Sequence, residues 1–269
     1  MPGPLFVHFP HSILHYVKKG TGSKALLLFH GFGQDHHAFD HLPEPLLLSH
    51  TLYVFDLFFH GASQWQQQEE PLEKKVWKEI LIQFLNENEI KTFSVMGFSM
   101  GGKFALACVE LFPKQVESVY LLAPDGIKTS MWYSLATYPF GFRHLFKSMI
   151  AHHSRFLMVA NLALKFKLID KGILRFVESQ MNTEEKRKRV YYSWVVFRHF
   201  QFDLDHIASI LNSKPAPLTL IIGQYDKIIT VKNMQPFINK LKEVCFEVIE
   251  AGHNDLIAKA GISLTVNRE

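Results

Sequence analysis

Cysteine is scarce in this chain of 269 residues, which contains only Cys108 and Cys245. Two cysteines cannot form the disulfide framework of a small secreted domain, and their separation does not match the paired spacing of structural zinc sites. Free cysteine is usually buried among apolar side chains, so both are expected to fill the core. The chain also lacks an apolar run of the roughly 18 residues needed to cross a bilayer, which predicts that it has no membrane span.

Signals for export and for low-complexity structure are missing as well. Met1-Pro2-Gly3-Pro4 has neither the basic nor the apolar region of a secretory signal, which favours a cytoplasmic location. Glycine and proline are modest at 15 and 12 residues, and the chain is 48% hydrophobic and 20% charged. These proportions are typical of globular proteins and exclude disorder, collagen and coiled coil. The length lies near the upper limit for a single core, so we expect one large domain that can carry an insertion.

Basic residues are concentrated in one part of the chain. The net charge is +4, but residues 127–213 hold 13 Lys and Arg against 6 Asp and Glu. The rest of the chain is therefore mildly acidic, and the basicity is local. A general role in nucleic-acid binding is not expected from this distribution.

Short apolar runs alternate with amphipathic segments outside the basic region. The strands expected from apolar runs are residues 5–9, 13–18, 25–30, 51–56, 93–97, 118–123, 217–223 and 244–249. The helices expected from fourfold spacing are residues 72–88, 100–112 and 231–241. Alternation of strand and helix predicts a mostly parallel sheet with helices on both faces.

The alternation stops after Gly126 and resumes near residue 217. Between these points the sequence is aromatic and basic, with helical periodicity and no strand pattern. We therefore expect a core domain formed by residues 1–126 and 214–269, and a helical insertion over residues 127–213.

The most informative motif is Gly97-Phe98-Ser99-Met100-Gly101, which lies between a predicted strand and a predicted helix. In a Gly-x-Ser-x-Gly turn of this kind the serine Oγ is pushed out above the sheet, and side chains at positions 97 and 101 would collide with neighbouring backbone. The pentapeptide alone is weak evidence, but the strand before it and the helix after it are the expected context. Ser99 is therefore the candidate nucleophile.

A serine nucleophile needs a general base and an acid that orients the base. His253 follows the last predicted strand, and Asp226 follows the strand before it. Because reactive groups gather at the carboxyl ends of parallel strands, Ser99, Asp226 and His253 can converge there. Asp125 also follows a strand and is the alternative acid.

The negative charge that builds on a carbonyl oxygen during acyl transfer needs preorganised N–H donors. One candidate is the backbone N–H of Met100, at the start of a helix. The other is the backbone N–H of Phe32, in a glycine-rich turn after a buried strand. In the same region, His30 is expected to bond the loop, and His60 is expected to be a packing residue.

Together these motifs resemble those of the alpha/beta-hydrolase superfamily, in particular its capped single-domain serine carboxylesterases, over nearly the whole chain apart from the insertion. The motifs that carry the resemblance are His30-Gly31-Phe32-Gly33, residues 56–63, residues 97–102, Gly223-Gln224-Tyr225-Asp226 and Gly252-His253. The resemblance implies an alpha/beta-hydrolase fold with a helical cap after strand six, and it assigns Ser99 as nucleophile, His253 as base and Asp226 as its orienter. It implies no cofactor and no metal. The loop after Asp56 departs from the family's usual D-x-P-G-x-G form.

The function expected from this resemblance is hydrolysis of a small or medium, partly apolar carboxylic ester through an acyl-enzyme. Serine at position 99 argues against the dehalogenase and epoxide hydrolase branches, which place an aspartate there. Carbon–carbon bond hydrolysis and a menaquinone-pathway-like elimination remain alternatives that use the same triad, the latter because Lys103 follows a Ser-Met-Gly-Gly sequence. A ligand-binding homologue without catalysis is the third.

The insertion bears on substrates and partners. Its aromatic residues are expected to form either an apolar pocket roof or contacts with the core domain; they include Trp132, Tyr133, Phe140, Phe142, Phe146 and Phe156. Its basic surplus could steer anionic substrates or an acidic carrier protein, as in the similar pimeloyl-carrier methyl esterases, or could be a solvated face. No nucleic-acid partner is expected.

Overall fold

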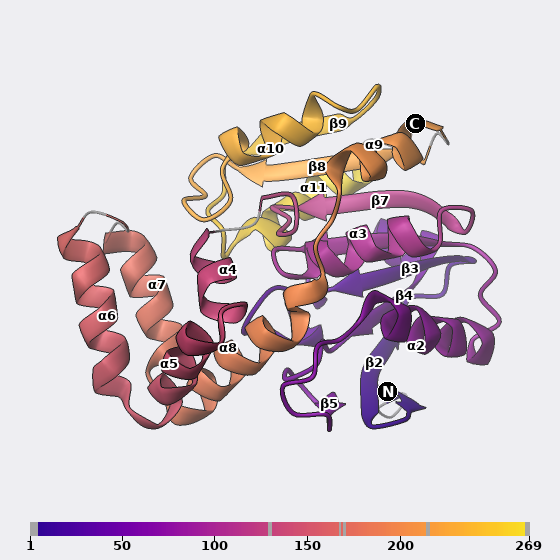
Figure 1. Cartoon of the computed structure of the whole chain (residues 1–269). Helices are drawn as coiled ribbons and strands as arrows, with labels where there is room; N and C mark the ends of the chain where they lie inside the picture. Colours follow the sequence, from indigo (N-terminus) through magenta and orange to yellow (C-terminus); the bar gives the residue numbers. More distant parts are fainter. Residues whose placement is uncertain (1–4, 129–130, 167, 169–170, 214–215, 267–269) are drawn as a thin grey trace. The chain divides into compact units, whose positions relative to one another are not determined.

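The computed structural model describes residues 5–128, 131–166, 168, 171–213 and 216–266 (Figure 1). In these residues nine strands form one sheet, in the order β1-β2-β4-β3-β6-β7-β8-β9 with β5 beside β2. The strands are β1 (Leu5–Phe9), β2 (Ser12–Lys19), β3 (Lys24–Phe29), β4 (His50–Phe55), β5 (Gln64–Trp65), β6 (Phe93–Phe98), β7 (Val116–Leu122), β8 (Leu218–Gly223) and β9 (Cys245–Ile249). All eight predicted strands are present within a few residues of their expected ends, and β5 is an additional short strand.

Only the amino-terminal edge of the sheet is antiparallel. β1 pairs with β2 as a hairpin, and β2 pairs antiparallel with β4. From β4 to β9 every neighbouring pair is parallel. The predicted mostly parallel sheet is therefore confirmed, and the carboxyl ends of six strands lie along one edge.

Helices cover both faces of the sheet. They are α1 (Glu44–Ser49), α2 (Lys74–Glu87), α3 (Gly101–Leu111), α9 (Leu204–Ser213), α10 (Val231–Ile238) and α11 (Leu256–Val266), with a 3-10 helix η1 (His36–Phe39). α2, α3 and α9 lie against one face, and α1 and α11 against the other (Figure 1). The sequence predicted α2, α3 and α10, and the structure adds the others.

Aromatic side chains join the helices to the sheet. The rings of Phe29 and Phe55 stack 5.4 Å apart on adjacent strands. Trp77 of α2 and Phe104 of α3 meet edge to face at 5.0 Å, and Phe104 also contacts Phe200. All five side chains are fully buried. Burial of rings this large contributes several kcal/mol to folding and fixes the direction in which α3 leaves β6.

The two cysteines differ in their surroundings. Cys108 of α3 is buried, as expected, but Cys245 is exposed. The prediction for Cys245 was wrong because it begins β9, and β9 is the last strand of the sheet. An edge strand has a neighbour on one side only, so an apolar residue there is not necessarily covered.

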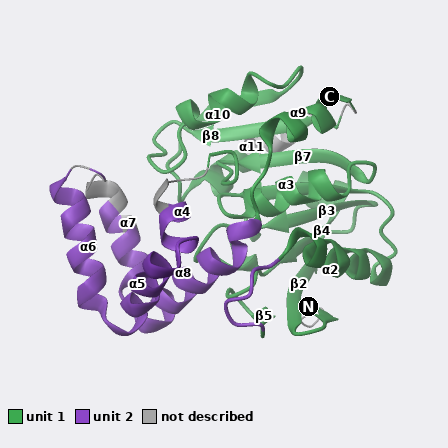
Figure 2. Ribbon diagram, viewed as in Figure 1, with its two compact units in different colours: residues 1–66, 73–128, 200–269 green, residues 67–72, 129–199 purple. Residues whose placement is uncertain are grey.

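The described residues divide into two compact units, shown in different colours in Figure 2. Unit 1 comprises residues 1–66, 73–128 and 200–269, and unit 2 comprises residues 67–72 and 129–199. The boundaries differ from the expected ones at three places, the smallest being residues 127–128, which group with unit 1. Residues 200–213 group with unit 1, because α9 lies against α3, and residues 67–72 group with unit 2.

Unit 2 is helical. Its elements are α4 (Met131–Thr137), α5 (Phe140–Ala151), α6 (His153–Lys165), α7 (Lys171–Met181), α8 (Glu184–Val196) and the 3-10 helix η2 (Phe197–His199). α8 is central: Tyr191 is buried, and its ring meets that of Phe146 from α5 at 5.2 Å. The buried Arg187 donates to the carbonyls of Ile150 and Met181 near the ends of α5 and α7. These contacts satisfy carbonyls that the ends of helices leave unpaired.

The aromatic residues singled out in the insertion are therefore not alike. Phe146 and Phe156 are buried, whereas Phe140 and Phe142 are exposed. The side chain of Trp132 lies outside the described residues. No helix in the described part of the chain combines the length and the apolarity required to cross a membrane.

Candidate active site

Ser99 lies directly after β6, where the chain turns sharply into α3. Its φ is +49°, in the left-handed region that non-glycine residues rarely adopt. A Cβ on Gly97 would lie 2.5 Å from the carbonyl oxygen of Gly101, and a Cβ on Gly101 would collide with the backbone of Phe29. The predicted steric need for both glycines is thus confirmed. The backbone amides of Gly102 and Asp125 donate to the Ser99 carbonyl, each at 2.8 Å, and hold the strained turn in place.

His253 comes from the loop after β9 and meets Ser99 across 154 residues of sequence. Its Nε2 lies 2.9 Å from Ser99 Oγ. Its ring also faces that of Phe98, at 5.0 Å between centroids. Phe98 is buried, so its ring limits the positions that the imidazole can occupy.

Asp226, from the loop after β8, completes the series. Its Oδ2 lies 2.6 Å from His253 Nδ1. Its other oxygen, Oδ1, accepts the backbone N–H groups of Ile228 and Ile229 at 2.8 and 2.9 Å. Three hydrogen bonds to one buried carboxylate fix its orientation. The structure thus brings Ser99, His253 and Asp226 together in the order expected for nucleophile, base and orienting acid.

The alternative acid has a different partner. Asp125 Oδ2 lies 3.0 Å from the Nζ of Lys103, whose side chain is buried. Lys103 lies in the first turn of α3, so the pair joins that helix to the loop after β7. Asp125 therefore supports the Ser99 turn through its backbone N–H and Lys103 through its carboxylate, while the acid bonded to His253 is Asp226.

The two predicted oxyanion donors lie in segments that meet closely. A Cβ on Gly31 would touch the ring of Phe98, so the turn that contains Phe32 lies against the Ser99 turn. The side-chain oxygen of Gln34 accepts the N–H of Gly31 at 3.0 Å. Within the described residues, the N–H groups of Phe32 and Met100 donate to no other group. Both remain available to a carbonyl oxygen.

Two histidines shape this turn. His30 Nδ1 donates to the Gly31 carbonyl at 2.7 Å, and its Nε2 accepts the N–H of Leu57 at 3.0 Å. Burial lowers the pKa of His30, which favours the neutral ring that this donor and acceptor pattern requires. The expected loop-bonding role of His30 is confirmed.

His60 does more than the expected packing. Its Nε2 accepts the N–H of Gly33 at 3.0 Å, and its Nδ1 lies 3.0 Å from the Phe58 carbonyl. Its ring stands perpendicular to that of Phe32 at 5.3 Å. His60 therefore positions the turn that carries the Phe32 N–H. The signal in the sequence was its place after a strand, at the same sheet edge as the candidate triad.

Asp56 is the centre of a third polar group at this edge. His15 Nδ1 lies 2.7 Å from one carboxylate oxygen and His36 Nδ1 lies 3.0 Å from the other. The backbone N–H groups of Ala62 and His36 bond the same two oxygens at 2.9 and 2.7 Å. Burial opposes ionisation of Asp56, but these hydrogen bonds outweigh it and lower its pKa. The side chains have the chemistry of a metal site, yet hydrogen bonding alone accounts for their arrangement.

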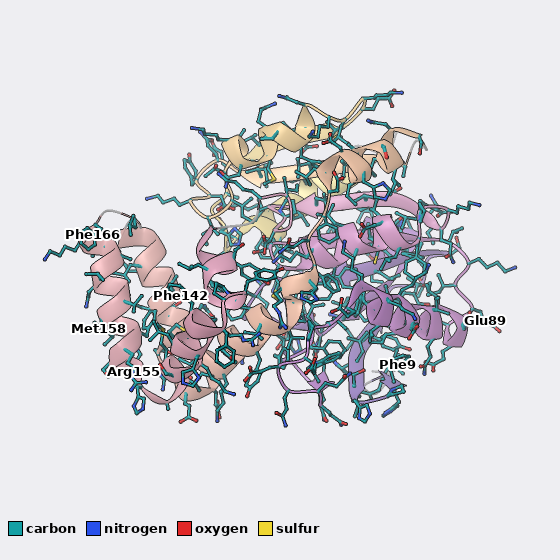
Figure 3. The ribbon with its side chains drawn as sticks, viewed as in Figure 1. Phe9, Glu89, Phe142, Arg155, Met158 and Phe166 are labelled. Atoms are coloured by element: carbon teal, nitrogen blue, oxygen red, sulfur yellow. The ribbon has the colours of Figure 1, made fainter. Side chains whose placement is uncertain are left out.

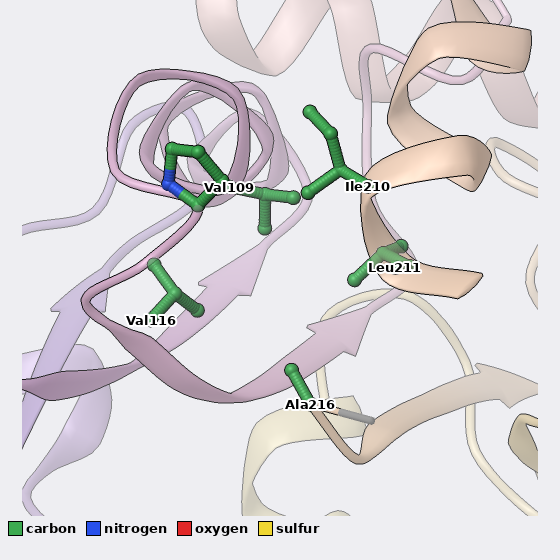
Figure 4. A pocket seen from close by; sticks show the side chains of 6 residues that line it. Val109, Val116, Ile210, Leu211 and Ala216 are labelled. Carbon is green, nitrogen blue, oxygen red and sulfur yellow. The ribbon is translucent and has the colours of Figure 1, made fainter. Parts of the chain in front are cut away.

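A small apolar pocket lies elsewhere in unit 1. It is formed mainly by residues of α3, β7 and α9 (Figure 4), namely Val109, Pro113, Val116, Ile210, Leu211 and Ala216. Ser99, His253 and Asp226 do not line this pocket. With no polar group among its side chains, this pocket has no means of orienting a substrate.

Curated proteins similar to this chain match only part of it. The dihydrolipoyllysine-residue acetyltransferase component of the acetoin cleaving system from Cupriavidus necator is 32% identical over 113 residues. That match covers 42% of this chain and 30% of the relative. The component of the same name from Pseudomonas putida is 32% identical over 110 residues, or 40% of this chain and 29% of the relative. The chain thus aligns with less than a third of the length of either relative.

Solved structures match nearly the whole chain at low identity. An esterase from Thermogutta terrifontis has a TM-score of 0.69 at 18% identity, covering 98% of this chain and 97% of that one. An enol-lactonase from Burkholderia xenovorans has a TM-score of 0.66 at 15% identity, covering 96% of each chain. At these identities the likeness shows the fold. The model of the alpha/beta hydrolase fold family matches residues 24–260, and the chain belongs to that family.

Proposed function

We propose that this protein is a serine hydrolase that cleaves carboxylic esters through a covalent acyl-enzyme. The observation that carries the proposal is the continuous series from Ser99 Oγ to His253 Nε2 at 2.9 Å and from His253 Nδ1 to Asp226 at 2.6 Å. Both distances are within hydrogen-bonding reach, which a nucleophile and its base need for proton transfer.

In the proposed mechanism Ser99 Oγ attacks the ester carbonyl while His253 Nε2 takes the hydroxyl proton. Asp226 accepts a hydrogen bond from Nδ1–H and stabilises the imidazolium that forms. The backbone N–H groups of Phe32 and Met100 bond the oxyanion. His253 then gives its proton to the leaving alkoxide and releases an alcohol. A water molecule, deprotonated by the same imidazole, next attacks the acyl carbon and regenerates Ser99.

The helical insertion, expected over residues 127–213, is proposed to act as a cap that selects the substrate. Support comes from its folding as a separate helical unit and from the aromatic side chains that it holds, among them the half-buried Tyr133. A cap lined by aromatic and aliphatic groups would favour esters with an apolar acyl or aryl part.

Ester hydrolysis is favoured over elimination by the surroundings of Lys103. In the sequence, Lys103 is the residue that resembles the menaquinone-pathway-like elimination enzymes. Lys103 is buried and paired with Asp125 at 3.0 Å, so its charge is engaged within the fold. This pairing supports a role in holding the Ser99 turn rather than in contacting a substrate.

The test is hydrolysis of p-nitrophenyl esters from acetyl to dodecanoyl by the wild type and by Ser99→Ala. We expect turnover with a chain-length optimum in the wild type, and a loss of at least ~1,000-fold in the variant, because removal of the nucleophile leaves only binding and oxyanion contacts. Labelling by a fluorophosphonate is the control for a reactive serine. Labelling of Ser99 without cleavage of any ester would reject esterase activity in favour of carbon–carbon cleavage or elimination. Absence of both would favour a binding protein.

A further inference from the structure

Helix α6 of unit 2 has most of its surface open to solvent. Along the helix only Phe156 and Ala160 are buried, and they are four residues apart, so they lie on one narrow side. Unit 2 places α5 and α7 against α6. Among the described residues, several apolar residues on the remaining circumference of α6 are exposed.

Apolar side chains occupy the open side. Met158 and Leu162 are 64% and 54% exposed, and Phe166, which caps the helix, is 63% exposed. At about 100° per residue Met158 and Leu162 lie roughly 140–180° from the midpoint of the buried pair, and Phe166 lies about 100° from it. Figure 3 shows Met158 and Phe166 following each other along this helix, with Arg155 at its other end. We call Arg155, Met158, Leu162, Lys165 and Phe166 the α6 surface.

Along the stretch of sequence that carries these side chains, the charge has one sign. Residues 126–169 contain six Lys and Arg and no Asp or Glu. Arg155 and Lys165 are exposed and project from the open side of the helix, among the three apolar residues. Their long aliphatic stems can lie along an apolar surface while the charged ends reach an aqueous, anionic one.

We propose that the α6 surface binds the headgroup region of an anionic phospholipid bilayer. A helix with exposed apolar residues, flanking Lys and Arg, and no acidic residues has the composition of helices that lie in a membrane interface. The apolar side chains enter the boundary between headgroups and acyl chains, and the basic side chains meet lipid phosphates. An acidic protein would need the charges but would leave Met158, Leu162 and Phe166 without an apolar counterpart.

The same chain provides a control surface in unit 1. Leu48 of α1 is 65% exposed, about as much as Met158, but lies on a helix whose only charged residue is Glu44. A glutamate at position 48 therefore removes an equally exposed apolar group from a surface that lacks the basic residues of α6.

The experiment is cosedimentation of the full chain with vesicles of phosphatidylglycerol and phosphatidylcholine mixed in equal parts, and with vesicles of phosphatidylcholine alone. We expect the wild type to bind the anionic vesicles at least tenfold more tightly, since each basic residue near such a surface adds roughly a fivefold effect. Met158→Glu with Leu162→Glu should weaken that binding at least tenfold, by the loss of apolar insertion and the addition of negative charge. Leu48→Glu should bind as the wild type does. Circular dichroism and thermal melting of each variant monitor folding.

Three results would overturn the proposal. The first is a wild type that binds neither kind of vesicle. The second is a doubly substituted protein that binds as the wild type does while Arg155→Glu with Lys165→Glu abolishes binding, because charge alone would then suffice, as for an acidic protein. The third is a lipid-free dimer, seen by sedimentation velocity, that Met158→Glu dissociates, because a second copy would then cover the surface. The readout is vesicle binding, so it does not depend on whether the chain cleaves esters.

Discussion

The two units differ in their most pronounced departure from the usual distribution of polar and apolar residues. Unit 1 buries polar groups: Asp56, Asp226, His30 and His60 are all inside it, each with hydrogen-bond partners. Unit 2 exposes apolar groups, including Met158 and others along α5 and α6. Burying polar groups and exposing apolar groups both cost free energy. Such places are therefore where function is expected. The buried polar groups of unit 1 suit the catalysis proposed for it, and the exposed apolar groups of unit 2 suit the recognition proposed for it.

The largest effect on catalysis is expected from removal of the acid that bonds His253. Asp226→Asn should lower kcat roughly 10,000-fold, because an amide stabilises the wrong tautomer of His253 and no longer compensates the imidazolium charge. Asp125→Asn is the matched control, since that carboxylate pairs with Lys103, and it should lower kcat less than ~10-fold. Ester hydrolysis measured for both variants decides between the acids. A larger loss in Asp125→Asn would transfer the role of triad acid to Asp125.

The buried polar groups of unit 1 can be tested for stability through Asp56. Asp56→Asn should lower the free energy of unfolding at pH 7 by about 2–4 kcal/mol, because the charge-assisted bonds to His15 and His36 are lost inside the fold. The pKa of Asp56 is lower in the folded state than its usual unfolded value of about 3.9. This stabilisation is therefore fully present above pH ~4 and disappears as the pH falls through the lower, folded pKa.

Urea unfolding of the wild type and Asp56→Asn between pH 7 and pH 3 measures this difference. The difference in free energy of unfolding between the two proteins should become smaller as the pH falls. Asp40→Asn is the control. Asp40 likewise bonds two basic side chains, a lysine and a histidine, but it is exposed. It should cost less than ~1 kcal/mol. If the difference in free energy of unfolding between the wild type and Asp56→Asn does not change with pH, the charge of Asp56 does not contribute to stability.

A smaller effect is expected at His60, which does not touch the reacting atoms. His60→Ala should lower kcat for ester hydrolysis roughly 10-fold, because the Gly33 N–H loses its partner and the turn that holds the Phe32 N–H is less well positioned. His60→Gln, which keeps an acceptor, should recover part of the loss. KM should change little. A variant with unaltered kcat would show that the turn holds its position without His60.

The smallest effect on the fold is expected in unit 2. Met158→Glu should change the free energy of unfolding by less than ~0.5 kcal/mol, since the side chain is 64% exposed. Phe146→Ala, in the same unit but buried against Tyr191, should cost about 3–5 kcal/mol. Thermal melting compares them. Strong destabilisation by Met158→Glu would show that Met158 is part of a folded core, and that the α6 surface has a structural role.

Local patterns in the sequence were enough to predict the elements that carry the site. Apolar runs over residues 25–30, 93–97 and 217–223 predicted β3, β6 and β8, because buried parallel strands are apolar on both faces. Gly97 and Gly101 gave the turn at Ser99, because only residues without a side chain fit there. Ser99, Asp226 and His253 were found from their places after strands, which topology brings to one edge.

The partners of the buried polar residues could not be predicted in this way. Nothing local distinguishes Asp125 from Asp226, since both follow strands; the distance between His253 and each carboxylate decides, and that distance depends on the packing of the whole sheet. His60 and Gly33 are likewise far apart in sequence but bonded in the fold. The exposure of Cys245 follows from the place of β9 at the sheet edge.

The sequence by itself therefore determined the strands, the nucleophilic turn, the candidate nucleophile and base Ser99 and His253, and two candidate acids, because backbone sterics and apolar periodicity are local properties. Only the tertiary structure decided which acid bonds His253, what holds the Phe32 turn, and which apolar residues of the insertion remain uncovered. These depend on distances between segments remote in the chain, and the strand order and helix packing of each unit fix those distances.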